Sequence, residues 1–204
     1  KIDSTDLFAN PIKDSYFTSD IGIIGVKHFI KVNDRSYFNT IIGATYNGSN
    51  YLEDNIATDT KPLERYVENK TNQIHYSINT SFNSKINSKL FVKVGVISEV
   101  INLILDARVK DSNSVWNKYW DFNDYTVLHQ AYVQAKYRFT EKLTLNIGMH
   151  AQLLTLNNSS SFEPRVGLKY QLNQKHSLSC GYGMHSQMQP TDVYFYRTLK
   201  TDGT

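Results

Sequence analysis

Apolar and polar residues alternate with a period of two along most of the chain, a pattern that predicts long β-strands. In 126–139 the odd-numbered positions are mainly apolar or aromatic, and the even-numbered positions are mainly polar. Alternation over so many residues indicates a strand with two chemically different faces. The same pattern predicts seven further strands, at 20–32, 36–51, 74–82, 90–108, 143–153, 162–172 and 178–185.

Polar segments between the predicted strands indicate four hairpins. Short turns are expected at 33–35, 84–88, 140–142 and 173–175, and longer connections at 52–73, 109–125 and, more briefly, 156–161. A blurred apolar phase predicts a bulge or a shift of face near 98–102. The predicted fold class is all-β: about eight antiparallel strands in one region, 1–204, without a domain boundary.

Three features favour a transmembrane β-barrel segment over a soluble sheet. Outer-membrane barrels have short periplasmic turns and longer extracellular loops, as expected here. Several predicted strands are longer than the roughly 9–11 residues that a tilted strand needs to cross a membrane. Aromatic residues gather near both ends of the strands, as they do at two lipid–water interfaces. The expected location is therefore the outer membrane, with lipid as a partner.

Composition narrows the class of protein further. No apolar run approaches the roughly 18 residues of a transmembrane helix. The 22 basic and 19 acidic residues are dispersed, which argues against a nucleic-acid partner. The single Cys180 excludes an internal disulfide. The chain begins at Lys1 without a signal peptide, so we interpret it as a piece of a longer protein. No nucleotide, zinc or nucleophile motif appears, and we predict neither an enzyme nor a cofactor.

Polar residues opposite the lipid-facing rows are expected to line a wet lumen or to contact a plug domain, since hydrocarbon excludes them. These lumen-facing candidates are Gln134, Lys136, Arg138, His150, Glu163, Arg165, Lys169 and His185. Glu163 and Arg165 share a face and predict a structural ion pair in preference to a substrate contact. His150 and His185, with Met149, Met184 and Met188 nearby, raise the hypothesis of haem or metal capture. We favour ordinary lumen-lining roles and predict no metal site, because a metal needs converging ligands.

The connection expected at 109–125 is rich in aromatic residues. As a substrate-binding loop it would use Trp116, Tyr119, Trp120 and Phe122, because exposed aromatics on loops are often binding residues. The alternative is an interfacial belt combined with packing of the loop on itself. The sequence leaves both interpretations open.

The run SFEPRVGLKYQLNQKHSLSCGYGMHSQMQP at 161–190 resembles a known family. Its Glu163-Pro164-Arg165 start, the Gly181-Tyr182-Gly183 run and His185-Ser186-Gln187 followed by Pro190 are similar to barrel strands of TonB-dependent outer-membrane receptors. The similarity is to the C-terminal part of the barrel in the Bacteroidetes type, which has a carboxypeptidase-regulatory-like N-terminal domain. The segment YFTSDIGIIGVKHF at 16–29 also resembles that family.

The resemblance implies a barrel of about 22 strands around a plug domain. Such a receptor would bind a scarce nutrient at the cell surface and import it with energy relayed by the TonB complex. Implied partners are the protein's own plug, the TonB complex through an N-terminal part outside this chain, and a surface-exposed binding lipoprotein. The alternatives are a complete eight-stranded structural or adhesion barrel, in which the first strand pairs with the eighth, and a soluble β-sandwich binding module with apolar faces buried against each other.

Overall fold

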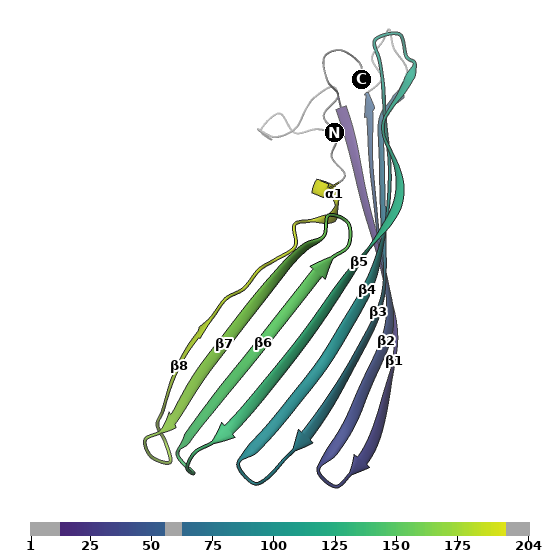
Figure 1. Ribbon diagram of the computed structural model, residues 1–204. Coiled ribbons are helices and arrows are strands. Elements are labelled where there is room, and N and C mark those ends of the chain that lie inside the picture. Colours follow the sequence, from purple (N-terminus) through teal and green to yellow (C-terminus); the bar gives the residue numbers. More distant parts are fainter. Residues whose placement is uncertain (1–12, 56–62, 195–204) are drawn as a thin grey trace. The chain divides into compact units, whose positions relative to one another are not determined.

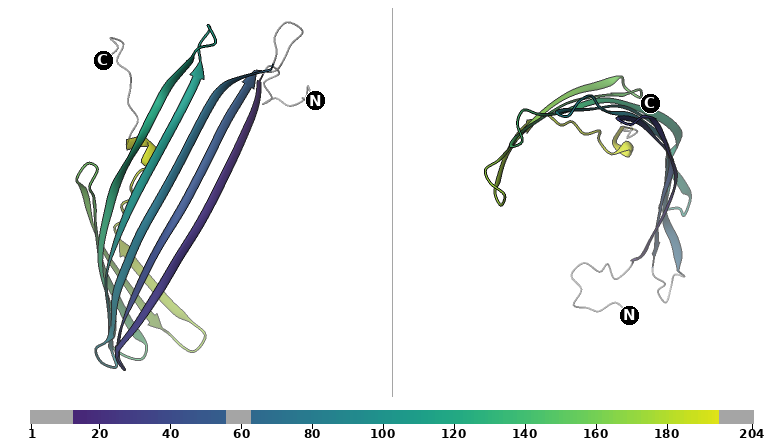
Figure 2. Two further views of the ribbon diagram at one scale, coloured as in Figure 1. Left: turned by 90° about the vertical axis from the view of Figure 1, so that its right-hand side faces the viewer. Right: turned by 90° about the horizontal axis from the view of Figure 1, so that it is seen from below.

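The computed structural model describes residues 13–55 and 63–194, and it is an all-β meander (Figure 1). Its strands are β1 Lys13–Asn33, β2 Ser36–Asn55, β3 Glu64–Lys85, β4 Leu90–Lys110, β5 Trp116–Arg138, β6 Leu143–Leu154, β7 Ser159–Gln171 and β8 Ser177–Gly183, followed by a four-residue helix, α1 Thr191–Tyr194. All eight strands form one sheet in sequence order (Figure 2). The predicted fold class, with eight antiparallel strands in four hairpins, is confirmed.

The strands β1 to β5 are longer than the sequence pattern indicated. β2 continues to Asn55 and β3 begins at Glu64, whereas a connection was predicted over 52–73. The residues 56–62 of that connection lie outside the described part of the chain. Only 111–115 separate β4 from β5, so the connection predicted at 109–125 is wrong. The predicted contrast between short turns and long loops is therefore wrong for the described residues.

Ion pairs between neighbouring strands account for this extension. The Lys110 Nζ lies 2.5 Å from Glu64 Oε1, which joins β4 to β3. The Lys118 Nζ lies 3.1 Å from Asp106 Oδ2, which joins β5 to β4. Opposite charges on one face of adjacent strands stabilise their pairing. A search for alternating apolar residues does not detect strands that are held together in this way.

The described residues form two compact units. The first unit contains 13–23, 45–55, 63–75 and 102–125, where the ion pairs between strands are concentrated. The second unit contains 24–44, 76–101 and 126–194, which include the whole of β6, β7 and β8. The lumen-facing candidates lie in the second unit, and the aromatic candidates of 109–125 lie in the first.

The register of β5 to β8 separates the second unit's residues into two faces. Gln134 pairs with Gly148, which pairs with Arg165. The next positions form the chain Ala135, Ile147, Val166 and Tyr182. Directly paired residues point to the same side of a sheet, and successive residues point to opposite sides. The predicted division into a polar face and an apolar face is therefore confirmed for β5 to β8.

Burial along β4 alternates without a change of phase. The even-numbered residues Val94, Val96 and Arg108 are exposed, whereas Leu103 and Leu105 are buried. The bulge predicted near 98–102 is therefore wrong, but the alternative, a shift of the apolar residues from one face to the other, is present. The even-numbered face of β4 carries Val94 and Val96 in its first half and charged residues from Asp106 onward. The odd-numbered face carries isoleucine and leucine from Ile101 to Leu105.

Candidate functional site: two opposite faces of one sheet

Large apolar side chains on one face of the second unit are exposed. Val166 is 45% exposed, Ile147 49% and Val96 57%. We call this surface the apolar face; its exposed members are Ile24, Val26, Ile42, Tyr76, Ile78, Val94, Val96, Val133, Ile147, Met149, Phe162, Val166, Leu168, Tyr170, Leu178 and Tyr182. Each of the strands β1 to β8 contributes at least one of them, and small or polar residues occupy the remaining positions. Contiguous apolar surface of this extent marks a surface that meets protein or lipid.

A hydrogen bond between Ser98 and His129 links β4 to β5 on the apolar face. Ser98 shares its side of β4 with Val94 and Val96, and its Oγ lies 3.0 Å from His129 Nδ1. His129 pairs with Leu153 and belongs to the apolar side of β5. The apolar rows of β4 and β5 therefore lie on the same side of the sheet.

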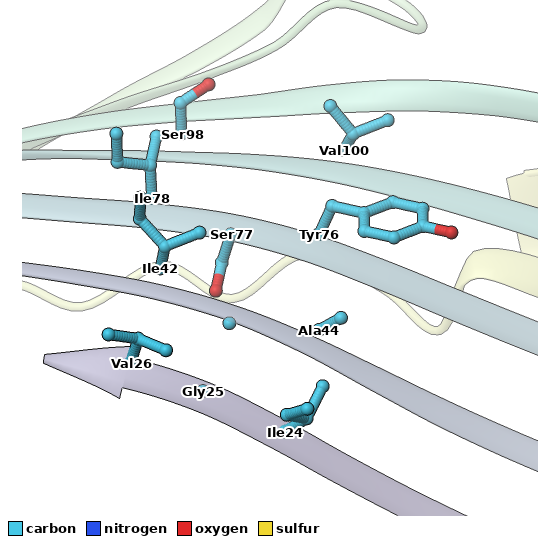
Figure 3. Close-up of a pocket in the computed structure, with 11 residues that line it drawn as sticks. Ile24, Gly25, Val26, Ile42, Ala44, Tyr76, Ser77, Ile78, Ser98 and Val100 are labelled. Carbon is cyan, nitrogen blue, oxygen red and sulfur yellow. The ribbon is translucent and has the colours of Figure 1, made fainter.

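A shallow apolar groove of about 540 Å³ lies on β1 to β4 (Figure 3). The apolar side chains that line it are Ile24, Val26, Ile42, Ala44, Tyr76, Ile78 and Val100. Gly25 and Gly43 contribute backbone to its floor between these side chains. Its few polar atoms fit an alkyl chain better than a polar ligand.

On the opposite, polar face, a buried carboxylate joins β6, β7 and the segment after β8. Glu163 is 3% exposed. Its Oε2 accepts a hydrogen bond from Arg165 Nη2 at 2.7 Å and lies 3.3 Å from His150 Nδ1. Its Oε1 accepts hydrogen bonds from the Ser186 amide at 3.1 Å and the Ser186 hydroxyl at 2.5 Å. A buried carboxylate is tolerated when its oxygens are satisfied in this way.

The segment after β8 leaves the sheet in order to reach Glu163. The Met184 amide still donates to the Pro164 carbonyl at 3.0 Å, as a continuing strand would. Ser186 then accepts a hydrogen bond from Gln152 Nε2 at 2.8 Å, on the polar face. Glu163 therefore holds 184–186 against the polar face, and β8 ends at Gly183.

The structure places the lumen-facing candidates as follows. It brings together His150, Glu163 and Arg165, and the predicted ion pair between Glu163 and Arg165 is present. Gln134, Lys136, Arg138 and Lys169 share the polar face with that cluster, as the register shows. His185 lies beyond the end of β8, where its neighbour Ser186 makes the contacts with Glu163. That these residues face a lumen or a plug stays a prediction.

The proposed haem or metal pair is not accompanied by further ligands. The His150 Nε2 lies 3.0 Å from Gln130 Oε1, so both ring nitrogens of His150 have protein partners. Within 13–55 and 63–194, no group of three or more His, Cys, Asp or Glu side chains is arranged to hold a metal.

The four aromatic candidates of 109–125 lie in β5, so the prediction that they form a loop is wrong. Those residues are Trp116, Tyr119, Trp120 and Phe122. Two cations from β4 lie over the Trp116 ring: the Arg108 Cζ is 4.9 Å and the Lys110 Nζ 5.3 Å from the ring centre. The Tyr119 hydroxyl donates to Asn69 Oδ1, and its ring lies 5.6 Å from Trp120. Cation–π and hydrogen-bond contacts extend the sheet here. A role in substrate binding stays a prediction.

Sequence reasoning missed Ser161, Ser186, Gln130 and Lys93 as members of the polar face's contacts. The Ser161 and Ser186 hydroxyl oxygens lie 2.6 Å apart, and the Lys93 amine lies 5.2 Å from the centre of the Tyr132 ring. Ser186 was missed because continued alternation would place it on the apolar face. An apolar position occupied by serine, two residues after Met184, was the available signal.

Comparisons with known proteins connect this chain to a solved structure at low identity. No protein-family model matches the chain, and no curated protein matches it. Among solved structures, the chain is similar to the translocator domain of the autotransporter NalP from Neisseria meningitidis, with a TM-score of 0.42 and 12% sequence identity. The likeness covers 84% of this chain and 61% of that chain, so this chain spans less than two thirds of that structure. Among the described helices, none is both long and apolar enough to traverse a bilayer.

Proposed function

We propose that this chain forms part of the wall of an outer-membrane β-barrel, with its apolar face in lipid and its polar face toward an enclosed aqueous space. The observation that carries the proposal is the exposure of large aliphatic residues on all eight strands of the second unit. Each fully buried valine or isoleucine gains roughly 1.5–3 kcal/mol relative to exposure in water. Lipid supplies that burial for a sheet that is one layer thick.

Two alternatives fit these contacts less well. A soluble sandwich requires a second sheet over the apolar face, but all eight described strands belong to a single sheet. A complete eight-stranded barrel requires β1 to pair with β8, but among the described residues these strands are the two ends of the sheet. A wall segment that pairs with further strands needs neither feature.

The finer proposal is that the barrel imports a scarce nutrient with TonB-coupled energy. Its support is the resemblance of 161–190 and 16–29 to TonB-dependent receptors. Within the resembling run, Glu163 and Ser186 of the polar-face cluster would serve to hold 184–186 on the lumen side. A plug domain would then rest against the remaining polar face.

Depth-dependent quenching of fluorescence tests the membrane placement. Tryptophan is introduced at Ile147 or at the adjacent Asn146 of the full protein, in a background whose native tryptophans are replaced by phenylalanine. Brominated lipids should quench the Ile147→Trp emission strongly and leave Asn146→Trp nearly unchanged, because successive residues face opposite sides. Equal quenching at both positions would overturn the proposal.

Uptake measurements test the finer proposal separately. Cells with the intact gene, cells lacking it and cells lacking TonB are supplied with limiting ferric chelates, cobalamin or oligosaccharides. We expect accumulation of at least one nutrient to be lost in both mutants. A nutrient that requires this protein but accumulates normally without TonB would refute TonB coupling while leaving the membrane placement intact.

A further inference from the structure

A second groove, of about 460 Å³, lies on β4 to β7 of the second unit, and its polar lining belongs to the polar face. Those lining residues are Lys93, Gln134, Lys136, Asn146, Gly148, Arg165 and Gly167. The groove lies beside the Glu163 cluster, which it touches through Arg165.

The charge of this face is unbalanced. Among the polar-face positions paired in β5 to β8, the cations are Lys136, Arg138, Arg165 and Lys169, and the one acid is Glu163. Glu163 is already bonded to Arg165. Within the described part of the chain, Lys136, Arg138 and Lys169 have no ion-pair partner. A surface lined by one sign of charge attracts groups of the opposite sign.

Arg165 is the groove cation nearest to the Glu163 cluster. Its Nη2 bonds to Glu163, and its Nε is enclosed by the protein. The side chain is nevertheless 41% exposed, so the outer part of its guanidinium can be reached by a carboxylate of a partner.

Glycines lower the floor of the groove between these cations. Gly148 and Gly167 lie on the polar face, opposite Arg165 and Asn146 respectively. A Cβ added at Gly167 would meet only the Cys180 carbonyl oxygen, at 3.8 Å, so its neighbours do not require glycine there. The missing side chain leaves space for a partner to approach the backbone closely.

We propose that this groove docks aspartate and glutamate side chains of a protein segment folded against the polar face. Carboxylates match the three lining cations, Lys93, Lys136 and Arg165, and they accept from planar guanidinium donors. The groove is an open depression on a sheet, whereas small ligands are bound in enclosed sites that cover about 70–90% of their surface. A protein surface is therefore the fitting occupant. The inference rests on the proposed function, in which this face borders an enclosed space.

Zero-length crosslinking of the full protein in native outer membranes tests the proposal. A water-soluble carbodiimide joins lysine amines to carboxylates that contact them, and mass spectrometry identifies the joined peptides. We expect Lys136 and Lys93 to be joined to Asp or Glu of a domain that the same polypeptide or a stable subunit supplies. Lys175, in the turn between β7 and β8, is the solvent-exposed lysine for comparison.

A side chain added at Gly167 fills the groove without removing any of its cations, which makes it a matched test variant. Gly167→Leu keeps every amine and should reduce the yield from Lys136 at least about fivefold, a loss near 1 kcal/mol of contact free energy. Gly22→Leu, at another glycine with room for a Cβ, should leave that yield unchanged. If Gly167→Leu is not assembled in membranes, Gly167→Ala should still reduce the yield about twofold, by about 0.4 kcal/mol.

The outcomes separate this inference from the proposed function. No crosslink from Lys136 or Lys93, with acylation by a soluble ester as fast as at Lys175, would overturn the groove's role. Selective protection of both lysines by citrate or phosphate, without crosslinks to protein, would also overturn it and indicate a small-anion site. Lipid quenching at Ile147→Trp reports on the barrel independently, so its loss would instead refute the membrane placement.

Discussion

The first and second units share the strands β1 to β5 but are stabilised by different interactions. In the first unit, β3, β4 and β5 are joined by charged pairs such as Glu64 with Lys110 and by cations against Trp116. In the second, apolar residues occupy one face and a buried carboxylate organises the other. One strand can therefore change the chemistry of its faces along its length without changing its phase, as β4 does.

This difference matches two surroundings. Exposed aliphatic rows are stable where lipid covers them, whereas paired charges suit strand ends in water. We expect the second unit to be destabilised by charges introduced on its apolar face, and the first unit to be destabilised by salt and by loss of its ion pairs. The expected effects range from a large loss of stability on the apolar face to a local change in an exposed turn.

A charge on the apolar face of the second unit gives the largest expected effect. Ile147→Arg should lower the free energy of unfolding from lipid vesicles by about 2–4 kcal/mol, because arginine would enter hydrocarbon. Asn146→Glu, one residue away on the polar face and paired with Lys136, should not lower it, because opposite charges on paired strands are compatible. Denaturant titration of the full protein measures both. Equal losses would mean that the two faces do not differ in their surroundings.

Loss of the buried carboxylate comes next. Glu163→Ala should cost about 1–3 kcal/mol, because Arg165 and Ser186 lose their acceptor and Arg165 is partly hydrated. Hydrogen exchange in 184–186 should accelerate in the same variant. Glu141→Ala, in the exposed turn after β5, should change stability by less than about 0.5 kcal/mol. Unchanged exchange in 184–186 would show that Glu163 does not hold that segment.

The strand count and the two faces of β5 to β8 were predictable because Val133, Ile147 and Val166 alternate strictly with polar neighbours. The ends of β4 and β5 were not, since they are stabilised by contacts between strands that alternation does not reveal: Lys110 pairs with Glu64 and also lies over the Trp116 ring. Glu163 was recognisable as half of an ion pair with Arg165, because the two residues lie two positions apart on one face of a strand. Its main hydrogen-bond donor, Ser186, depends on the chain leaving the sheet after Gly183. Periodicity carries no information about that departure.

The exposed ion pairs of the first unit should make a smaller contribution to stability, and salt should weaken it. Glu68 pairs with Arg108, which is 47% exposed, so Glu68→Gln should cost only about 0.2–1 kcal/mol. Raising NaCl to about 1 M shortens the Debye length to about 3 Å and should accelerate amide exchange in 64–70 and 104–110. Exchange in β6, whose pairing does not rely on exposed charges, serves as the internal control. Salt-independent exchange in 64–70 would remove the proposed role of the ion pairs.

The turn between β4 and β5 gives the smallest and most local effect. The Asp111 carboxylate accepts hydrogen bonds from the amides of Val115 and Asn113, each at 2.9 Å, and these bonds lower the pKa of Asp111. Ser114 has a φ of 61° within the same turn. A carboxyl group whose pKa is lowered by folding stabilises the folded state when it is ionised. That contribution is fully present above the ordinary aspartate pKa of about 3.9 and disappears as pH falls through the lower pKa of the folded state.

Amide protection of Val115 and Asn113, corrected for intrinsic exchange, should therefore be lower at about pH 2.5 than at about pH 5, since only the ionised group accepts both bonds fully. Asp111→Asn retains one acceptor oxygen but cannot ionise, so its protection should be lower at pH 5 and nearly independent of pH. Protection in β6 provides the reference for global acid unfolding. If Val115 protection falls in parallel with β6, the effect is global, and the turn is not an independently titrating element of the first unit.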